Sequence, residues 1–214
     1  GVYTKSDATG DIHKYCFGLA KVLEKKYGVD FKFSETIKDI KKSNEPILQT
    51  NKNEYEFDDI ILCTGVETER FRRKFGDSFR IYPVKGYSVT VDLEDDKSRE
   101  SAPFVSLLDD PSKLVASRLG NRLRVAGTAE LAGYNKDIRS NRIKPLLNWI
   151  NDLFPEVNTK NYLPWTGLRP MSSDMVPIIR ESKRKNVFYN SGHGHLGWTM
   201  GTYSGKLAAD LVDQ

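Results

Sequence analysis

A glycine-rich turn between a strand and a helix constrains the fold of this 214-residue chain most. The turn reads G-H-G-H-L-G at residues 192–197. It follows a predicted strand at residues 187–190 and precedes a predicted helix over residues 198–212. Glycines let a backbone approach a ligand closely, and a helix N-terminus offers N–H groups to an anion. The order strand, turn, helix predicts an α/β unit. A glycine turn that binds nothing is the alternative that the residues leave open.

The same six residues match the G-x-G-x-x-G pattern of dinucleotide-binding sites. Such a site also needs a second strand that ends in an acidic residue about 20 positions later. Only Asp210 and Asp213 follow the motif as acidic residues, and they lie on or just after the predicted helix. The context therefore argues against a complete dinucleotide-binding unit at this turn.

The first third of the chain adds further α/β elements. Residues 11–27 predict an amphipathic helix that Thr9 or Asp11 caps and Gly28 ends. Apolar and polar residues alternate over residues 29–33, and this pattern predicts a strand. Further short strands are expected at residues 37–40, 46–50 and 55–57, with a polar turn at residues 41–45.

The run Ile60-Ile61-Leu62-Cys63 is apolar on both faces, which is typical of a strand buried inside an α/β layer. It ends at Thr64-Gly65, and open α/β sheets bind ligands at the carboxyl ends of their strands. A plain strand-to-loop turn explains this segment equally well.

The middle of the chain has a different pattern of predicted elements. Short strands are predicted at residues 87–93, 104–108, 114–117 and 122–126, with a hairpin at residues 119–123. A helix is predicted over residues 138–154, with an apolar face made of Ile143, Leu146, Leu147 and Ile150. We therefore expect an α+β insert with an antiparallel sheet inside an α/β frame.

Composition excludes several classes of protein. Twenty-three aromatic residues (10 Phe, 10 Tyr, 3 Trp) rule out a disordered chain, and a net charge of +4 does not indicate nucleic-acid binding. No apolar run approaches the ~20 residues of a transmembrane helix. Two cysteines make no disulfide scaffold. His193 and His195 lie only two residues apart and His13 is distant, so no metal site is expected.

Two basic residues lie in notable local sequences. Arg169 stands between Leu168 and Pro170 in W-T-G-L-R-P-M, which predicts an extended backbone that could present its planar fork to a carboxylate. A surface arginine is the commoner alternative. Lys85, in Y-P-V-K-G-Y, is expected to be solvated rather than functional.

Several motifs occur here in one characteristic order. They are Y-P-V-K-G-Y-S-V-T at residues 82–90, G-T-A-E at 127–130, W-T-G-L-R-P-M at 165–171 with Asp174 and Pro177, S-G-H-G at 191–194 and L-G-W-T-M at 196–200. In these motifs the chain resembles bacterial D-amino acid dehydrogenases of the D-amino acid oxidase-like superfamily of FAD enzymes. The resemblance runs from about residue 9 to the last residue.

The resemblance implies a partial Rossmann-like FAD domain (residues 1–78 and 165–214) with an inserted antiparallel-sheet substrate domain (residues 79–164). It implies FAD-dependent oxidation of D-amino acids to 2-oxo acids and ammonia, with electrons passed to a quinone or another respiratory acceptor. A cytoplasmic protein, peripheral on the inner face of the bacterial inner membrane, is the corresponding location. The reaction needs no protein base if the amine binds neutral, so the functional residues act by positioning.

The resemblance also assigns site residues by position. Arg169 corresponds to the arginine that binds the substrate carboxylate, and His195 lies near the substrate. The residues expected to contact FAD are Ile37, Thr64, Gly65, Gly192, His193, Gly194, Leu196, Gly197, Trp198 and Thr199. A helix N-terminus beside the flavin would stabilise the negative charge that reduction puts on the ring.

The chain departs from the family pattern at three places. His195 stands where these dehydrogenases usually have Thr, and Met175 and Arg180 replace two glycines of D-G-x-P-x-x-G. The N-terminal G-x-G-x-x-G, which holds the FAD pyrophosphate in this family, is not found in this sequence. We therefore expect a C-terminal portion of such an enzyme, completed by an N-terminal segment or a partner subunit.

Two alternatives remain open. One is a cofactor-free module that binds amino acids or a partner subunit, and the other is a relative of glycine or sarcosine oxidase.

Overall fold

The computed structural model describes residues 1–41, 43 and 45–214. The chain divides into two compact units: residues 1–19 with 85–168, and residues 20–84 with 169–214. Helix α1 (Ile12–Tyr27) and strands β5 (Ile81–Asp92) and β9 (Leu163–Ser172) run from one unit into the other. The domain bounds 1–78, 79–164 and 165–214 stay a prediction.

The first unit is built on a five-stranded sheet. Its order is β6 (Leu107–Asp109), β7 (Leu114–Leu119), β8 (Arg122–Glu130), β5 and β9. Neighbours from β6 through β5 pair antiparallel. The predicted hairpin between β7 and β8 is confirmed, with Gly120 at a φ of 64° in its turn.

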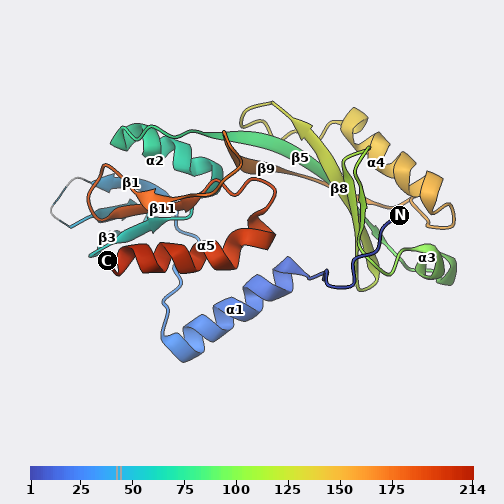
Figure 1. Cartoon of the computed structure of the whole chain (residues 1–214), viewed down its shortest axis with the longest axis horizontal. Coiled ribbons are helices and arrows are strands. Elements are labelled where there is room, and N and C mark those ends of the chain that lie inside the picture. The colour runs from blue at the N-terminus through green and yellow to red at the C-terminus, as the bar shows by residue number, and fades with distance from the viewer. Residues whose placement is uncertain (42, 44) are drawn as a thin grey trace. The chain divides into compact units, whose positions relative to one another are not determined.

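Helix α4 (Ser140–Leu153) packs against β8, as Figure 1 shows. Alternate strand residues such as Val89, Val91 and Val125 point to the same face of the sheet and are fully buried. Of the predicted helix face, Ile143, Leu146 and Ile150 are buried against this core, while Leu147 is partly buried. A short helix, α3 (Asp96–Ser101), begins at Asp95, whose carboxylate accepts the Ser98 N–H at 2.8 Å.

The second unit contains two three-stranded sheets. One has the order β10 (Ile178–Glu181), β11 (Val187–Ser191), β4 (Ile60–Leu62), with β11 parallel to β4 and antiparallel to β10. The other is the antiparallel meander β1 (Ile37–Lys41), β2 (Ile47–Thr50), β3 (Glu54–Glu56). The expected mixture of an α/β frame and an antiparallel α+β part is therefore confirmed.

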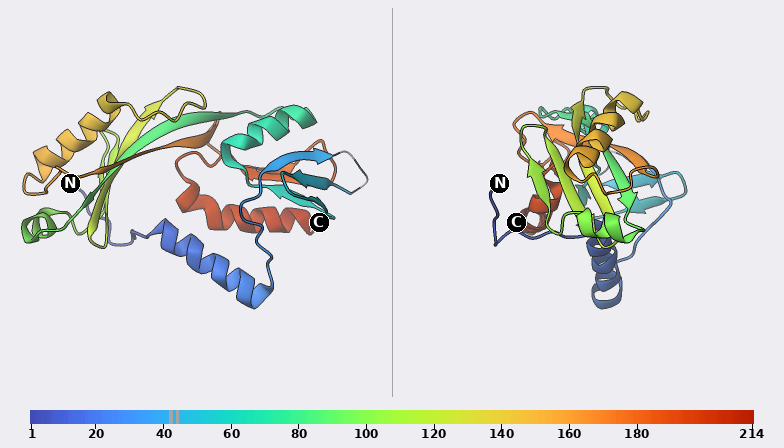
Figure 2. Two further views of the ribbon diagram at one scale, coloured as in Figure 1. Left: turned by 180° about the vertical axis from the view of Figure 1, so that it is seen from behind. Right: turned by 90° about the vertical axis from the view of Figure 1, so that its right-hand side faces the viewer.

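Helices complete the second unit. Helix α5 (Gly197–Val212) packs against β10 and β11, as the left view of Figure 2 shows. A 3₁₀ turn (Gly65–Glu67) leads from β4 into α2 (Thr68–Phe75). Side chains from β1, β4, α2 and β11 form the buried core: Ile40, Ile60, Leu62, Phe71, Val187 and Tyr189.

A buried aspartate anchors the β10–β11 turn. The carboxylate of Asp77 accepts hydrogen bonds from the Ser182 hydroxyl (2.7 Å), the Tyr189 hydroxyl (2.8 Å) and the Lys183 N–H (2.9 Å). Burial alone would raise the pKa of Asp77, but these hydrogen bonds outweigh burial and hold the pKa below its ordinary value. The charged carboxylate thus ties the α2–β5 connection to the turn.

The expected strand at residues 29–33 is wrong, because these residues form no strand. Alternation fixes which way side chains point, but a strand also needs a neighbouring backbone to pair with. Phe33 is 75% exposed and Ser34 turns the chain at a φ of 58°. Of the predicted polar turn at residues 41–45, positions 42 and 44 lie outside the described residues.

Two expectations about burial are also corrected. Strand β4 is not buried on both faces, since Ile61 is 41% exposed. The apolar face of α1 is exposed, although Asp11 does cap this helix by accepting the His13 N–H at 3.0 Å. The sequence patterns also did not predict helices α2 and α3 or strands β9 and β10. In the part of the chain that the structure describes, no helix is long and apolar enough to cross a membrane.

Candidate functional site

Two of the predicted loops meet at one edge of the second unit. Strands β4 and β11 are parallel neighbours, with Tyr189 opposite Leu62. Parallel strands end at the same edge of a sheet. The Thr64-Gly65 loop therefore lies beside the Ser191-Gly192 loop.

Hydroxyl groups connect these two loops. Thr68 at the start of α2 donates to the Ser191 Oγ at 2.9 Å, and Ser191 donates to the Gly65 carbonyl at 3.2 Å. The hydroxyls of Thr64 and Thr68 lie 2.9 Å apart. Thr68 and Ser191 are buried, so this network fixes both loops in a region from which water is excluded.

The glycine turn adopts backbone angles that favour glycine. Gly192 has a φ of 81° and Gly194 a φ of 57°. A Cβ on Gly194 would lie only 2.6 Å from the Met171 sulfur. Gly194 therefore allows the turn to lie directly against the end of β9.

Backbone contacts join the turn to the arginine motif. The Gly194 N–H donates to the Pro170 carbonyl at 2.9 Å, and Met171 forms a bridge with His193. Arg169 immediately precedes these residues and is half-buried. The structure thus brings the Arg169 segment and the glycine turn together within the second unit.

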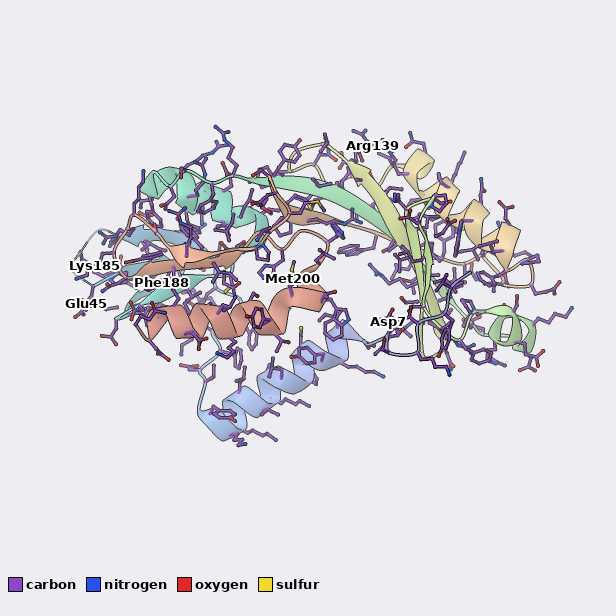
Figure 3. The ribbon with its side chains drawn as sticks, in the orientation of Figure 1. Asp7, Glu45, Arg139, Lys185, Phe188 and Met200 are labelled. Atoms are coloured by element: carbon purple, nitrogen blue, oxygen red, sulfur yellow. The ribbon has the colours of Figure 1, made fainter. Side chains whose placement is uncertain are left out.

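Helix α5 begins directly after the turn. Its first backbone bond runs from the Met200 N–H, on the first turn of the helix (Figure 3), to the Leu196 carbonyl at 2.9 Å. The Leu196 side chain provides no capping hydrogen bond, and the N–H groups of a helix's first turn generally point away from the helix's own carbonyls. His195, Leu196, Trp198 and Thr199 are exposed. The helix start is therefore placed to interact with a negatively charged or carbonyl-bearing ligand.

His193 differs from its exposed neighbour His195. Its Nε2 lies 2.7 Å from the Ser204 hydroxyl on α5. Burial lowers the pKa of His193, so its ring is neutral at neutral pH. Its side chain thereby connects the turn to the second turn of the helix that follows.

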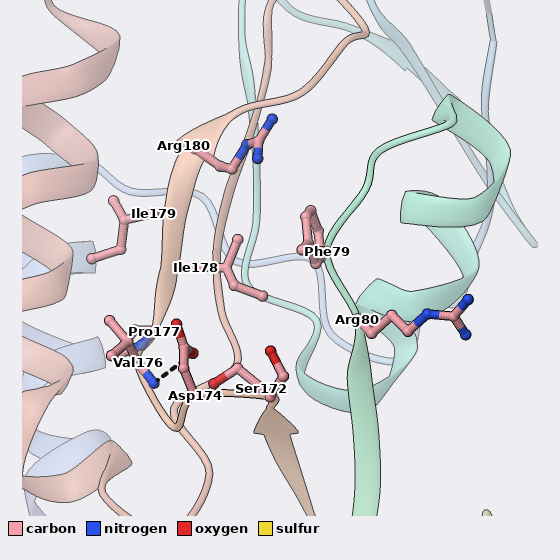
Figure 4. A pocket seen from close by; sticks show the side chains of 10 residues that line it. Phe79, Arg80, Ser172, Asp174, Val176, Pro177, Ile178, Ile179 and Arg180 are labelled. Atoms are coloured by element: carbon pink, nitrogen blue, oxygen red, sulfur yellow. Dashed lines mark hydrogen bonds between the residues drawn. The ribbon is translucent and has the colours of Figure 1, made fainter.

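A cavity of about 250 Å³ lies between the β9–β10 connection and the start of β5 (Figure 4). Its lining includes Phe79, Arg80, Ser172, Asp174, Ile178 and Arg180. The Ser172 side chain is buried, and its Oγ has no hydrogen-bond partner among the described residues. Asn190, next to the turn, likewise has an Oδ1 without a donor in the described part of the chain.

These features fit the ring end of the expected FAD. The glycine turn allows close approach, the start of α5 presents the N-terminal end of a helix, and two buried polar atoms nearby have no partner among the residues that the structure describes. The residues that could hold the cofactor are therefore those of the Thr64-Gly65 loop and of the turn from Gly192 to Thr199. Their roles, and those of Arg169 and His195, stay predictions.

Ile37 does not join these loops. It lies in the β1–β2–β3 sheet, its side chain packs against the core of the second unit, and its carbonyl accepts the Arg70 guanidinium at 2.9 Å. Its predicted contact with FAD stays a prediction.

Met175, one of the departures from the family pattern, has a φ of 64°. Glycine adopts this left-handed conformation without strain, whereas methionine does not. The structure therefore explains in backbone terms why a glycine suits this position. Arg180 is exposed at the edge of the cavity.

The expectation that Lys85 is solvated is wrong. Lys85 is fully buried in the first unit, and its Nζ lies 3.3 Å from Glu130, 3.1 Å from the Asn135 side chain and 3.0 Å from the Asp137 carbonyl. Glu130 also accepts the Tyr87 hydroxyl at 2.5 Å. A buried lysine requires such partners, and sequence spacing alone does not reveal them.

Sequence reasoning missed three residues of the candidate site: Thr68, Ser172 and Ser204. Thr68 follows Thr64 by four residues, which would have been a usable signal had α2 been recognised. Ser204 carries no signal without the fold. Within the described ranges, no group of three or more His, Cys, Asp or Glu side chains could hold a metal ion.

Comparison with known sequences gives a consistent picture. A family model described as FAD dependent oxidoreductase matches residues 1–211. "D-amino acid dehydrogenase 3" of Mesorhizobium japonicum is 46% identical over 99% of this chain and 52% of its own length. "D-amino acid dehydrogenase" of Paramagnetospirillum magneticum is 39% identical over 99% of this chain and 50% of its own. The chain spans about half the length of the curated relatives it matches.

Solved structures show the same fold at low identity. Glycine oxidase of Bacillus cereus superposes with a TM-score of 0.75 at 21% identity. The match covers 87% of this chain and 52% of the glycine oxidase chain. L-Proline dehydrogenase of P. horikoshii superposes with a TM-score of 0.75 at 17% identity, and the match covers 89% of this chain and 52% of that enzyme's chain. The resemblance found in the motifs is thus confirmed by sequence and by fold. The chain belongs to the FAD-dependent oxidoreductase family.

Proposed function

We propose that this chain supplies the flavin-ring and substrate-carboxylate part of an FAD-dependent D-amino acid dehydrogenase, which converts D-amino acids to 2-oxo acids and ammonia. The observation that carries the proposal is the meeting of three segments in one unit. These are the Thr64-Gly65 loop, the Gly192–Thr199 turn and helix start, and the strand end that bears Arg169. The dehydrogenases at 39–46% identity support the choice of substrate.

Arg169 would bind the substrate carboxylate through two parallel N–H···O bonds. Its backbone is fixed by Pro170, whose carbonyl accepts the Gly194 N–H. The carboxylate would thereby be held at a set position relative to the glycine turn. Such positioning is the main contribution that the protein makes when no side chain has to remove a proton.

Bound FAD supplies the two-electron acceptor for the hydride that leaves Cα. The N-terminal N–H groups of α5 would stabilise negative charge at the edge of the ring, and the Thr199 hydroxyl would add a donor there. The exposed His195 would contact the substrate side chain and tune specificity.

The electron acceptor and the location follow from the same resemblance. We infer that electrons pass to a quinone or another respiratory acceptor, at the cytoplasmic face of the inner membrane. Reduction of a soluble quinone analogue in the presence of a D-amino acid, and co-sedimentation with lipid vesicles, would test these two points.

Calorimetric titration with D-alanine and with L-alanine tests the proposal. The chain should bind D-alanine more tightly than L-alanine, and Arg169→Ala should weaken binding of the D-enantiomer by about 10- to 100-fold, since hydrogen bonds to charged groups contribute roughly 1.5–3 kcal/mol. Arg122→Ala, an exposed arginine in the first unit, is the matched control and should bind normally. Equal binding by wild type and Arg169→Ala would refute the assignment of Arg169.

The two alternatives give different results. A cofactor-free module would bind amino acids but show no flavin absorbance after incubation with FAD. A glycine or sarcosine oxidase relative would prefer glycine or sarcosine in the same titration.

A further inference from the structure

A buried serine on α5 contacts the glycine turn from the helix side. Ser204 is 3% exposed. Its hydroxyl lies 2.7 Å from His193 Nε2 and 3.0 Å from the Gly201 carbonyl. Both distances are those of good hydrogen bonds.

The contact with the Gly201 carbonyl favours one direction for these bonds. A serine hydroxyl has one proton to donate and two lone pairs that accept. The Gly201 carbonyl can only accept, so Ser204 donates its proton there. The Ser204 oxygen therefore faces His193 with a lone pair, and Nε2 has to carry the proton between them.

We infer that Ser204 is a positioning residue that holds His193 in the neutral Nε2–H tautomer and so fixes the glycine turn and the adjacent Arg169. The part of this inference that concerns Arg169 and substrate rests on the proposed function. The tautomer and the fixing of the turn do not.

The contacts extend from Ser204 to Arg169 without a gap. His193 is bonded to Ser204 through its side chain and forms a backbone bridge with Met171. The next residue, Gly194, donates its N–H to the Pro170 carbonyl at 2.9 Å. The His193 side-chain contact and the two backbone contacts that hold the end of β9 against the turn therefore involve consecutive residues of the turn.

The charge of the ring supports the same arrangement. Burial lowers the pKa of His193, so a single proton is shared between two ring nitrogens at neutral pH. With that proton on Nε2, Nδ1 is left as an acceptor. His193 would thus offer a bound ligand a lone pair, while the N–H groups of α5 offer donors.

The other direction of the short bond predicts the opposite tautomer. The Ser204 hydroxyl has one proton, which it could donate to Nε2 in place of the Gly201 carbonyl. If the contact with Gly201 were incidental, the shorter bond would run from the Ser204 hydroxyl to Nε2. The proton of His193 would then be on Nδ1.

Nitrogen NMR of the ¹⁵N-labelled full chain distinguishes these two cases without any ligand. The wild type should show His193 with a protonated Nε2 and a bare Nδ1. Ser204→Ala, a substitution that a helix tolerates well, should give a mixture of both tautomers and faster amide exchange at Gly194. Ser204→Thr keeps the hydroxyl and should show the same single tautomer as the wild type. Gly205→Ala, one residue away, should also leave the tautomer unchanged.

Binding measurements then test the link to substrate. Ser204→Ala should weaken D-alanine binding about five- to tenfold, the ratio that corresponds to one hydrogen bond. A protonated Nδ1 in the wild type, or unchanged Gly194 exchange in Ser204→Ala, would overturn the positioning role. A wild-type chain that binds no D-alanine but shows the Nε2–H tautomer would refute the proposed function and leave the positioning of the turn confirmed.

Discussion

At the scale of single residues, polar side chains buried in this fold are bonded to partners distant in sequence. Lys85 forms an ion pair with Glu130, and hydrogen bonds join Asp77 to Ser182 and Thr68 to Ser191. Sequence patterns located residues such as Gly192 whose role is set by the local backbone, because a glycine in a turn can be recognised from its neighbours in sequence. They missed Ser204 and misjudged Lys85 because burial of a polar group depends on tertiary contacts.

We predict that Lys85→Met destabilises the chain. The change removes a donor from a buried group of acceptors and leaves Glu130 with Tyr87 and Arg139 as partners. Thermal unfolding should show a clearly lower midpoint than for Lys97→Met, which alters an exposed lysine on α3. Equal midpoints for the two variants would contradict the structural role of Lys85.

Asp77 should make stability dependent on pH in acid. Its folded pKa lies below the ordinary value of 3.8, so the contribution to stability is fully present above 3.8 and is lost as the pH falls through the folded value. Denaturant unfolding of wild type should therefore weaken on acidification below about pH 4. Asp77→Asn should be less stable at neutral pH and lose less on acidification, and parallel pH profiles for both proteins would count against the account.

Met175→Gly should stabilise the chain. The left-handed conformation costs an L-residue roughly 1–2 kcal/mol, which exceeds the roughly 0.5–1 kcal/mol that glycine loses through its greater freedom in the unfolded chain. We expect a gain of up to about 1 kcal/mol in the free energy of unfolding. Met175→Ala keeps a Cβ and should show no such gain.

At the scale of elements, hydrophobic periodicity located most helices and strands correctly. Helix α4 and strand β8 have regular apolar faces and were placed within a few residues. The expected strand at residues 29–33 failed because alternation does not provide a pairing partner. Helix α2 was missed because six of its eight residues are polar or charged, so its apolar signal is weak.

A side chain at Gly194, in the turn before α5, should destabilise the chain. Gly194→Ala places a Cβ 2.6 Å from the Met171 sulfur at a φ of 57° and should cost at least about 1–2 kcal/mol. Gly205→Ala within α5 meets no atom within 4 Å and should instead stabilise by about 0.5–1 kcal/mol. Chemical denaturation of both variants measures the contrast, and a neutral Gly194→Ala would show that the turn is not closely packed.

At the scale of the whole molecule, the order of motifs along the chain predicted more than any single motif. The glycine turn alone was ambiguous, and Arg169 alone read as a surface residue. The fold explains why they belong together, since parallel pairing of β4 with β11 and the bridge from Met171 to His193 place three separate segments at one site. No local pattern contains that pairing, because it joins residues more than 120 positions apart.

The central claim is that the glycine turn and the start of α5 hold a flavin ring. Riboflavin tests it most directly, because it carries the ring without pyrophosphate or adenine. Titration of the chain into riboflavin should quench its fluorescence saturably, Gly194→Ala should weaken the quenching, and Gly205→Ala should leave it unchanged. The absence of saturable quenching, or equal quenching by wild type and Gly194→Ala, would contradict the claim.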